Sequence, residues 1–493
     1  MVLTLLFAVP ALAAAYLLLA GRGLSAESAR WVAGLAAGLA LLIAVIVSVS
    51  RPSVDASWVP SLGLRWRFAV DGVSVPLVLL TAVIGLLVVL HSARELPDGG
   101  RPSTFLGSLL LVEAGALATF TAMDAILFFV SFEIVLVPMW VLISRFGDPH
   151  DAPARRDAGQ RFILYTAVGS TLMLVGILLL VTTAGTSDLG QLATNAGRAI
   201  PANRQALIAA LLVLGLAVKV PVFPLHTWLP PAHTTAPTAG SVVLASVLLK
   251  MGTYGLVRLP AATLPAGFAK VAPFLGIAGV IGIVWGGLVC LVERDLKRLI
   301  AYSSVAHMGF VALGLSTGTR TGLQAALFAN IAHGVISALL FFVVGGLKAR
   351  WGSVKLDIAR PAIRETAPHL GFLLILGLAA GLGLPGLAGF WGEFLAMYAA
   401  WTGPTGHPAL FRTLAVVAAL GAAVAAAYQL RVARQVWVGD EVTDRSGAAE
   451  DARGTERAVI TVLAVAIIGL GVLPGLLLSV TDPAVSFLLG GGR

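Results

Sequence analysis

Apolar runs of about twenty residues recur along the whole chain, and short clusters of charged residues separate them. A run of this length, folded as an α-helix, matches the roughly 30 Å hydrocarbon core of a bilayer. Charged residues make up only 12% of the sequence, against about 25% in soluble domains. A chain of this kind cannot cover a surface that faces water. The sequence therefore predicts an all-α polytopic membrane protein.

Reading the apolar runs between charged breaks predicts about fourteen spans. The first run has no positive charge ahead of it and is long enough to span, so we interpret it as a transmembrane helix rather than a signal peptide. The expected spans are 2–20, 31–49, 72–91, 104–122, 124–145, 162–184, 206–232, 239–259, 272–291, 298–317, 322–347, 370–400, 410–437 and 458–480.

Positive residues between the spans predict the orientation. Of the 33 Lys and Arg residues, 21 follow odd-numbered spans, 10 lie on the other side, and the remaining two lie inside spans. Because cytoplasmic loops carry the excess of positive charge, both termini are expected outside the cytoplasm. The net charge of +9 mostly reflects this bias. The arginines are scattered over short loops and form no stripe, which argues against nucleic acid as a partner.

Glu113 lies inside the apolar run "LLLVEAGALATF" and is a weaker relay candidate. Four further charged residues lie inside apolar runs. They are Glu133, Lys219, Lys250 and Glu393, and all but Lys219 are near the middle of a predicted span. A buried ion pair that joins helices, or a lysine that reaches the headgroups, would explain one such residue. Four of them, two of each sign, favour an ion or proton path, which is the default interpretation of ionisable groups within a membrane.

Two of the predicted spans should be broken. The span at 206–232 contains Pro221, Pro224, Pro230 and Pro231, and the span at 370–400 contains Pro385 among glycines. Proline removes a backbone donor and clashes with the preceding turn. Paired interruptions in two halves of a membrane chain indicate a transport site. The breaks are five spans apart, and this odd offset suggests two inverted repeats, spans 4–8 and 9–13.

Four histidines accompany these charges: His226, His233, His307 and His333. A neutral imidazole both donates and accepts a hydrogen bond and therefore suits a proton relay, although a single buried histidine is more often a packing residue. No two of them share a metal-ligand spacing on one element, so we predict no metal site. The single cysteine, Cys290, excludes a disulfide within the chain and a cysteine-held iron–sulfur cluster.

Five long segments around these charges and histidines carry specific motifs. They are "SFEIVLVPMW", "AVKVPVFPLHTWLPPAHTTAPTAGSVVLASVLLKMGTYGLVR", "RDLKRLIAYSSVAHMGF", "NIAHGVISALLF" and "LPGLAGFWGEF". These segments resemble the antiporter-like subunits of bacterial respiratory complex I, the proton-translocating NADH–quinone oxidoreductase, which are related to multisubunit cation/proton antiporters. The resemblance extends over about residues 100–400. Among the M, L and N types of this family, a glutamate on the second broken helix favours the M type, and Glu393 occupies that position.

This resemblance implies roles for the buried charges. Glu133 matches the carboxylate that pairs with the pumping lysine, which is Lys219. Lys250 matches the central lysine, and Glu393 the terminal proton site. The four histidines occupy relay positions.

The resemblance also implies an organisation and a setting for the chain. Its parts would be helices 1–3 (1–100), a first half (101–260), a second half (261–437), and a loop with a final helix (438–493). The expected partners are the neighbouring antiporter-like subunits L and N, the lipid bilayer and protons, in the bacterial inner membrane. No cofactor is expected in this chain, since FMN, iron–sulfur clusters and quinone would belong to partner subunits.

Two other functions remain open from the sequence. One is a subunit of a multisubunit sodium/proton antiporter, which Glu393 disfavours and which sodium dependence would reveal. The other is a membrane scaffold that does not pump. Such a scaffold would tolerate neutralisation of Lys219 and Glu393 without loss of pumping.

Overall fold

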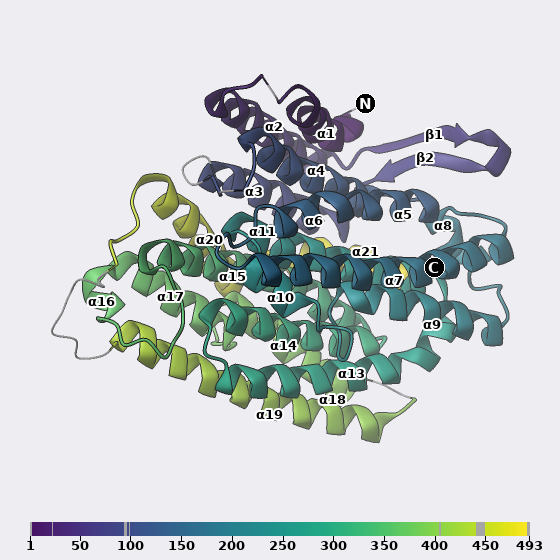
Figure 1. Ribbon diagram of the computed structural model, residues 1–493. Helices are drawn as coiled ribbons and strands as arrows, with labels where there is room; N and C mark the ends of the chain where they lie inside the picture. The colour runs from purple at the N-terminus through teal and green to yellow at the C-terminus, as the bar shows by residue number, and fades with distance from the viewer. Residues whose placement is uncertain are drawn as a thin grey trace.

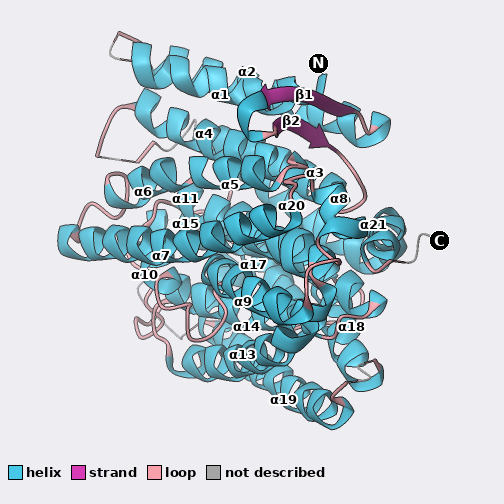
Figure 2. Ribbon diagram, turned by 90° about the vertical axis from the view of Figure 1, so that its right-hand side faces the viewer, coloured by secondary structure: helices cyan, strands magenta, loops and turns pink. Residues whose placement is uncertain are grey.

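Long helices run side by side through the molecule, from α1 (Val2–Ala20) and α2 (Ala26–Ser50) at one edge to α19 (Pro408–Val432) at the opposite edge (Figures 1 and 2). The computed structural model describes residues 2–21, 23–92, 96–97, 99–403, 406–439 and 449–490. Nearly all regular structure in these residues is helical, as the apolar runs predict.

The first half of the chain contributes the following further helices. They are α3 (Ser74–Ser92), α4 (Pro102–Thr121), α5 (Ala125–Ile134), α6 (Leu136–Ser144), α7 (Ala152–Ala184), α8 (Leu189–Gln191), η2 (Leu192–Ala196), α9 (Ala202–Lys219), α10 (Leu229–Thr235), α11 (Thr238–Val243), η3 (Leu244–Leu248), α12 (Leu249–Leu256) and η4 (Val257–Ala261). Here η2, η3 and η4 are π-helical turns.

The second half and the C-terminal region contribute the rest. They are α13 (Pro265–Val292), α14 (Leu296–Ser316), α15 (Arg320–Trp351), α16 (Ile363–Thr366), α17 (Pro368–Gly381), α18 (Ala388–Thr402), the π-helical η5 (Ala433–Val438), α20 (Gly454–Val472) and α21 (Pro474–Leu488). The halves are packed together, since α9 contacts α13 and η3 contacts α15.

Thirteen helices in the described part of the chain are long and apolar enough to cross a membrane. The predicted span at 370–400 is not among them, because it is divided into the shorter helices α17 and α18. Counting this divided span confirms the expected number of about fourteen. The last span ends earlier than predicted: Pro474 begins α21 after α20 has ended at Val472.

Both predicted breaks are present. In the first, α9 ends at Lys219 and α10 begins at Leu229, with irregular backbone between them. In the second, α17 ends at Gly381 and α18 begins at Ala388. Gly383 and Gly386 in this second break have φ angles of 76° and 91°, a region that favours glycine because it has no Cβ.

The structure departs from an all-α fold in the loop at 50–71, where no strands are predicted from the sequence. β1 (Ser53–Val59) and β2 (Leu64–Ala69) form an antiparallel hairpin, joined by the short helix η1 (Pro60–Leu62) and drawn in magenta in Figure 2. The hairpin projects from the end of the bundle (Figure 1). Both strands are short and mix polar with apolar residues, so they do not stand out from an ordinary loop.

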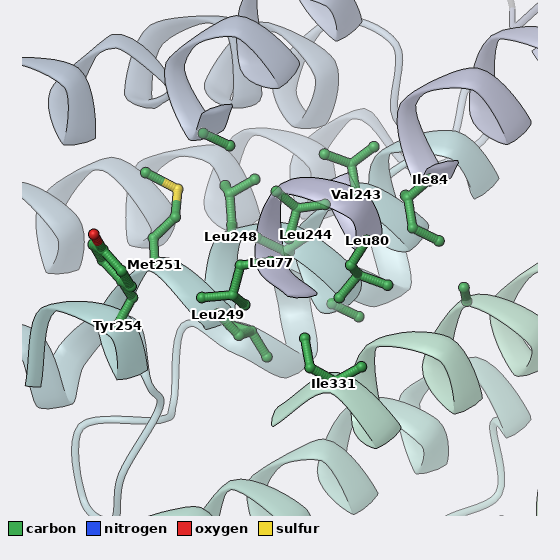
Figure 3. Close-up of a cluster of buried hydrophobic side chains, with 14 of the residues drawn as sticks. Leu77, Leu80, Ile84, Val243, Leu244, Leu248, Leu249, Met251, Tyr254 and Ile331 are labelled. Carbon is green, nitrogen blue, oxygen red and sulfur yellow. The ribbon is translucent and has the colours of Figure 1, made fainter. Parts of the chain in front are cut away.

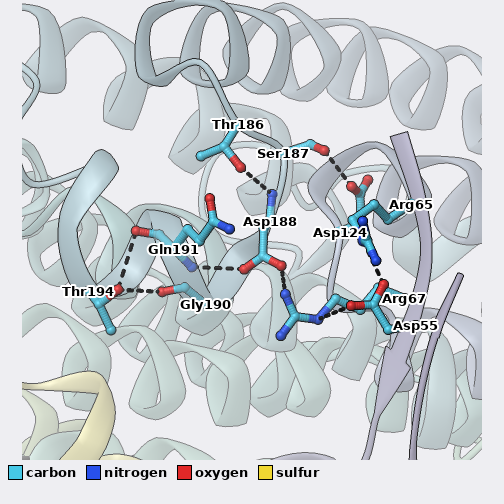
Figure 4. A network of polar contacts seen from close by, with 10 residues as sticks. All are labelled: Asp55, Arg65, Arg67, Asp124, Thr186, Ser187, Asp188, Gly190, Gln191 and Thr194. Atoms are coloured by element: carbon cyan, nitrogen blue, oxygen red, sulfur yellow. Dashed lines mark hydrogen bonds and ion pairs between the residues drawn. The ribbon is translucent and has the colours of Figure 1, made fainter. Parts of the chain in front are cut away.

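Polar contacts join this hairpin to the first half (Figure 4). Arg67 on β2 forms an ion pair with Asp188, at the start of α8. Asp124 accepts hydrogen bonds from the backbone amides of Ile126 and Leu127, so it caps α5 as a helix N-cap does. Ser187 donates its hydroxyl hydrogen to the same Asp124 carboxylate. The start of α5, which carries Glu133, is therefore fixed at this end of the molecule.

An apolar core surrounds the segment η3–α12 (Figure 3). Leu244, Leu248 and Leu249 pack there with Leu77 and Leu80 of α3, and all five are buried. Lys250 follows Leu249 directly and is also fully buried. The fold thus places this lysine in surroundings from which water is largely excluded.

Candidate functional site

Lys250 is hydrogen-bonded in the centre of the molecule. Its Nζ atom lies 2.7 Å from Nδ1 of His333 on α15. The other ring nitrogen of His333 lies 3.1 Å from the Ser337 hydroxyl, one turn further along α15. Both nitrogens of this buried imidazole therefore have partners. One predicted lysine and one predicted relay histidine, 83 residues apart in sequence, meet as a pair.

Glu393 and His307 form a second pair. His307 Nδ1, on α14, lies 2.9 Å from the Glu393 carboxylate on α18. Glu393 is only 7% exposed, and a Cβ atom on Gly383 in the second break would come within 2.9 Å of its Oε2. The glycine in this break therefore leaves room for the carboxylate.

The two pairs adjoin one another. The rings of His307 and His333 have their centroids 5.7 Å apart. A cavity of about 20 Å³ lies between His307, His333 and Glu393, with Ala332 also in its wall. A cavity that holds one water molecule needs about 10–15 Å³ and several polar groups in its wall. The site therefore forms a nearly continuous polar series, from Lys250 through two imidazoles to Glu393.

Lys219 has different surroundings. It is the last residue of α9, is 2% exposed, and its Nζ atom has no hydrogen-bond partner among the described residues. The rings of Phe132 and Phe162 flank the ammonium group, with centroids 5.1 and 5.8 Å away. Aromatic faces attract a cation only weakly. The lysine is therefore buried without a strong partner.

The expected ion pair between Glu133 and Lys219 is not formed in this structure. Glu133 Oε1 instead accepts a hydrogen bond of 2.5 Å from the hydroxyl of Ser170 on α7. The physical reason is that the Ser170 hydroxyl, on α7, already supplies a hydrogen-bond donor to the Glu133 carboxylate. Ser170 is not among the residues predicted from the sequence, because a serine inside an apolar helix has no distinguishing pattern.

Hydrogen bonds from nearby side chains stabilise the irregular backbone of the first break, between α9 and α10. Trp228 donates its indole N–H to the carbonyl of Val218, at 2.9 Å, and so satisfies a backbone acceptor near the end of α9. Tyr165 on α7 shares a 2.6 Å hydrogen bond with Thr227. Irregular backbone at membrane depth requires such partners.

The two histidines near this break are not joined to either lysine. His226 stacks on Phe223, with ring centroids 5.5 Å apart, and its Nδ1 has no partner in the described residues. His233 on α10 is fully buried against Phe341, and neither of its ring nitrogens has a partner there. The structure thus brings together four of the eight predicted site residues and leaves a gap between Lys219 and Lys250.

A larger cavity, of about 400 Å³, opens where α10 ends and α14 begins, and its wall includes Lys297 and His91. The buried Lys297 ammonium donates to the carbonyl of Ala236. Asp148 and Lys348, also in the wall, pair at 2.5 Å. Burial, the largest single influence, would raise the pKa of the Asp148 carboxyl. The hydrogen bonds from Lys348 and from the His150 backbone amide, with the positive charge of Lys348, together outweigh burial and keep that pKa below its ordinary value. This cavity gives water access to the end of α10.

Comparisons with known proteins show the family of the chain. The family of transmembrane NADH:quinone oxidoreductase and Mrp antiporter proteins matches residues 122–419. A NAD(P)H-quinone oxidoreductase chain 4 of Synechococcus sp. (strain JA-2-3B'a(2-13)) is 38% identical over 425 residues, which are 85% of this chain and 78% of that protein. NADH-quinone oxidoreductase subunit M of Rhodobacter capsulatus is 34% identical over 508 residues, covering 99% of this chain and 96% of that protein.

A solved structure shows the same fold. A chain of respiratory complex I from Thermus thermophilus with bound NADH superposes with a TM-score of 0.86 at 31% identity, and the match covers 100% of both chains. The protein therefore belongs to the NADH:quinone oxidoreductase and Mrp antiporter family of multi-pass membrane proteins. Within it, the chain is an antiporter-like subunit of respiratory complex I of the M type, called chain 4 in cyanobacteria. The resemblance read from the sequence is confirmed.

Proposed function

We propose that this subunit moves protons across the membrane through its buried lysines, histidines and glutamates, driven by quinone reduction elsewhere in complex I. The observation that carries the proposal is the adjacency of two bonded pairs, Lys250 with His333 and His307 with Glu393. An ion pair that only held two helices together would need just two charged residues. Four titratable groups in series, around a cavity large enough for water, provide successive sites between which a proton can pass.

In this proposal Lys219 is the switch. Apolar surroundings disfavour the charged form of a lysine, whereas a nearby carboxylate favours it. Lys219 would hold a proton while Glu133 is close and release it when the two separate. Its place at the end of α9, directly before the proline break, supports such movement, because the following backbone is not confined by a regular helix.

The released proton would pass to Lys250 and then through His333 and His307 to Glu393. Uptake from the cytoplasm would use the cavity beside Lys297, with His226 and His233 as relay groups near the broken helix. This direction of transport, out of the cytoplasm, follows from the predicted orientation, in which both termini lie outside the cytoplasm. Moving one charge against 100 mV requires about 2.3 kcal/mol. That energy would come from partner subunits, and the subunits of the L and N types would be the immediate neighbours.

Replacement of Lys219 tests this function. Arginine at this position keeps the positive charge but does not deprotonate in a protein. We expect Lys219→Arg to assemble into the complex and to lower NADH-driven proton pumping by about tenfold or more, since a proton-transfer group typically contributes at least that much. Pumping would be measured in membrane vesicles and normalised to the assembled complex.

A double replacement separates the switch from a structural clamp. Buried ion pairs can often be exchanged for apolar residues without loss of stability. If the pair only held helices together, Glu133→Leu with Lys219→Met would still pump. We expect this variant to assemble and remain inactive. Near-normal pumping by it, or by Lys219→Arg, would exclude the proposed switch, and pumping that follows sodium rather than protons would indicate the antiporter function instead.

A further inference from the structure

The hydroxyl of Ser170 differs from those of two threonines on the same helix in what it contacts. Thr171 and Thr182, also on α7, donate to carbonyls four residues earlier in the same helix, those of Ala167 and Leu178. This internal bond is a common arrangement for serine and threonine within helices. Ser170 instead donates across to another helix, to the Glu133 carboxylate at 2.5 Å. The serine is also buried, with 6% exposure.

The contact made by Ser170 coincides with a contact that Lys219 lacks. No nitrogen–oxygen distance of 4.0 Å or less joins Lys219 to a carboxylate in the described residues, and its Nζ atom has no hydrogen-bond partner there. The carboxylate that would pair with Lys219, that of Glu133, is hydrogen-bonded to Ser170 instead. A hydroxyl bonded to a carboxylate makes one of the shorter and stronger hydrogen bonds in proteins. The serine can therefore keep Glu133 away from the ammonium.

We infer that Ser170 is a positioning residue that stabilises the separated state of Glu133 and Lys219, and so sets how often Lys219 can release its proton. The inference rests on the proposed function of Lys219. The two arrangements differ in the partner of one carboxylate: the serine hydroxyl in the separated state, and the lysine ammonium in the paired state. Removing the hydroxyl would favour the paired state.

Three replacements at this position and one beside it test the inference in the assembled complex. Ser170→Ala removes the donor. Ser170→Cys keeps nearly the same size but offers only a weak donor. Ser170→Thr keeps the hydroxyl. Thr171→Ala is the matched control, because it removes a hydroxyl from the adjacent position that bonds only within α7.

We expect the alanine and cysteine variants to lower NADH-driven pumping severalfold per assembled complex, and the threonine and control variants to pump like the native protein. An infrared carboxylate band, assigned through its loss in Glu133→Gln, should shift in the alanine and cysteine variants and stay in place in the control. The band reports the partner of Glu133, which a purely structural change in α7 would leave unaltered.

Native pumping or an unmoved band in Ser170→Ala would overturn the inference. So would a threonine variant as defective as the alanine variant, since the effect would then depend on packing rather than on the hydroxyl. A failure of the proposed function has a separate signature, which is near-normal pumping by Lys219→Arg. If Lys219→Arg is defective while Ser170→Ala is normal, only the role of the serine is excluded.

Discussion

The two buried lysines have opposite surroundings. Lys250 is fixed in mid-span by a hydrogen bond to His333, and a second bonded pair lies beside it. Lys219 lies at a helix end, next to aromatic rings, with no partner for its ammonium in the described residues. The difference shows that burial alone does not define what a charged residue in a membrane does. One lysine is part of a connected series, and the other has no hydrogen-bond partner in the described residues.

Local sequence explains much of this contrast. Lys219 directly precedes a segment in which Pro221 and Pro224 prevent a continuous helix. Lys250 lies within a helical segment whose neighbouring side chains, Leu249 and Met251, are buried in the apolar core. The chain thus places one buried lysine at a break and the other within a helix.

The strongest test of the comparison replaces one histidine from each region. We expect His333→Leu to lower proton pumping by about tenfold or more, because it removes the group between Lys250 and His307. His226→Leu should have a smaller effect, since no hydrogen bond joins this ring to either lysine in the described structure. The measurement is NADH-driven pumping in vesicles, normalised to assembled complex.

His407→Leu provides the control for these two variants, because this histidine is exposed at the start of α19 and lies outside the series. It should pump like the native protein. If His226→Leu proves as harmful as His333→Leu, the contrast between a connected and an unconnected region is wrong.

A smaller effect is expected from filling the cavity between the two histidines. Ala332→Val adds two methyl groups to the wall of this space of about 20 Å³ and would exclude water from it. Pumping should fall by a few-fold at most if water assists the transfer beside the direct contacts. Ala338→Val is the matched control, since Ala338 is also buried on α15 but does not line the cavity.

Overpacking a core costs about 1–3 kcal/mol, so both valine variants should lose similar thermal stability. Only Ala332→Val should change pumping. An equal loss of pumping in the two variants would show that general strain in α15, rather than the cavity, is responsible.

The smallest effect on activity is expected from two cysteine substitutions at exposed positions. They test the predicted orientation of the chain in the membrane. Asn195→Cys should react with an impermeant maleimide added outside intact cells, and Ala154→Cys should not. Neither should change pumping, because both positions are exposed. Cys290 is buried and should contribute little background. Reaction of Ala154→Cys alone would invert the orientation predicted from the positive residues.

The sequence predicts the spans and the breaks well, because both follow from local properties: apolar length and proline. It also identifies the charged residues, since a lysine or glutamate within an apolar run is conspicuous. Which of them touch is not a local property. Lys250 meets His333 across 83 residues, and this contact depends on how two helices are rotated against each other.

Two further features had no usable signal in the sequence. Ser170 resembles any other hydroxyl in an apolar helix, and only the position of Glu133 beside it gives it a role. The hairpin at Ser53–Ala69 has strands of seven and six residues, and the side chains are mostly exposed in β1 and mostly half-buried in β2. Its stability depends on contacts such as Arg67 with Asp188, from a distant part of the chain.

The two π-helical turns, η3 and η4, on either side of α12 have a consequence for insertions and deletions in this span. A π-helical turn accommodates one residue more than an α-helical turn. Each residue rotates an α-helix by about 100°. Deleting one residue from η3 would therefore turn α12 relative to α11 and move Lys250 off the face that meets α15. In a homologue that lacks the extra residue of η3, the lysine would point in another direction, so its histidine partner, which is His333 here, would have to lie on a different helix face. The length of η3 and the position of this histidine should therefore vary together among homologues.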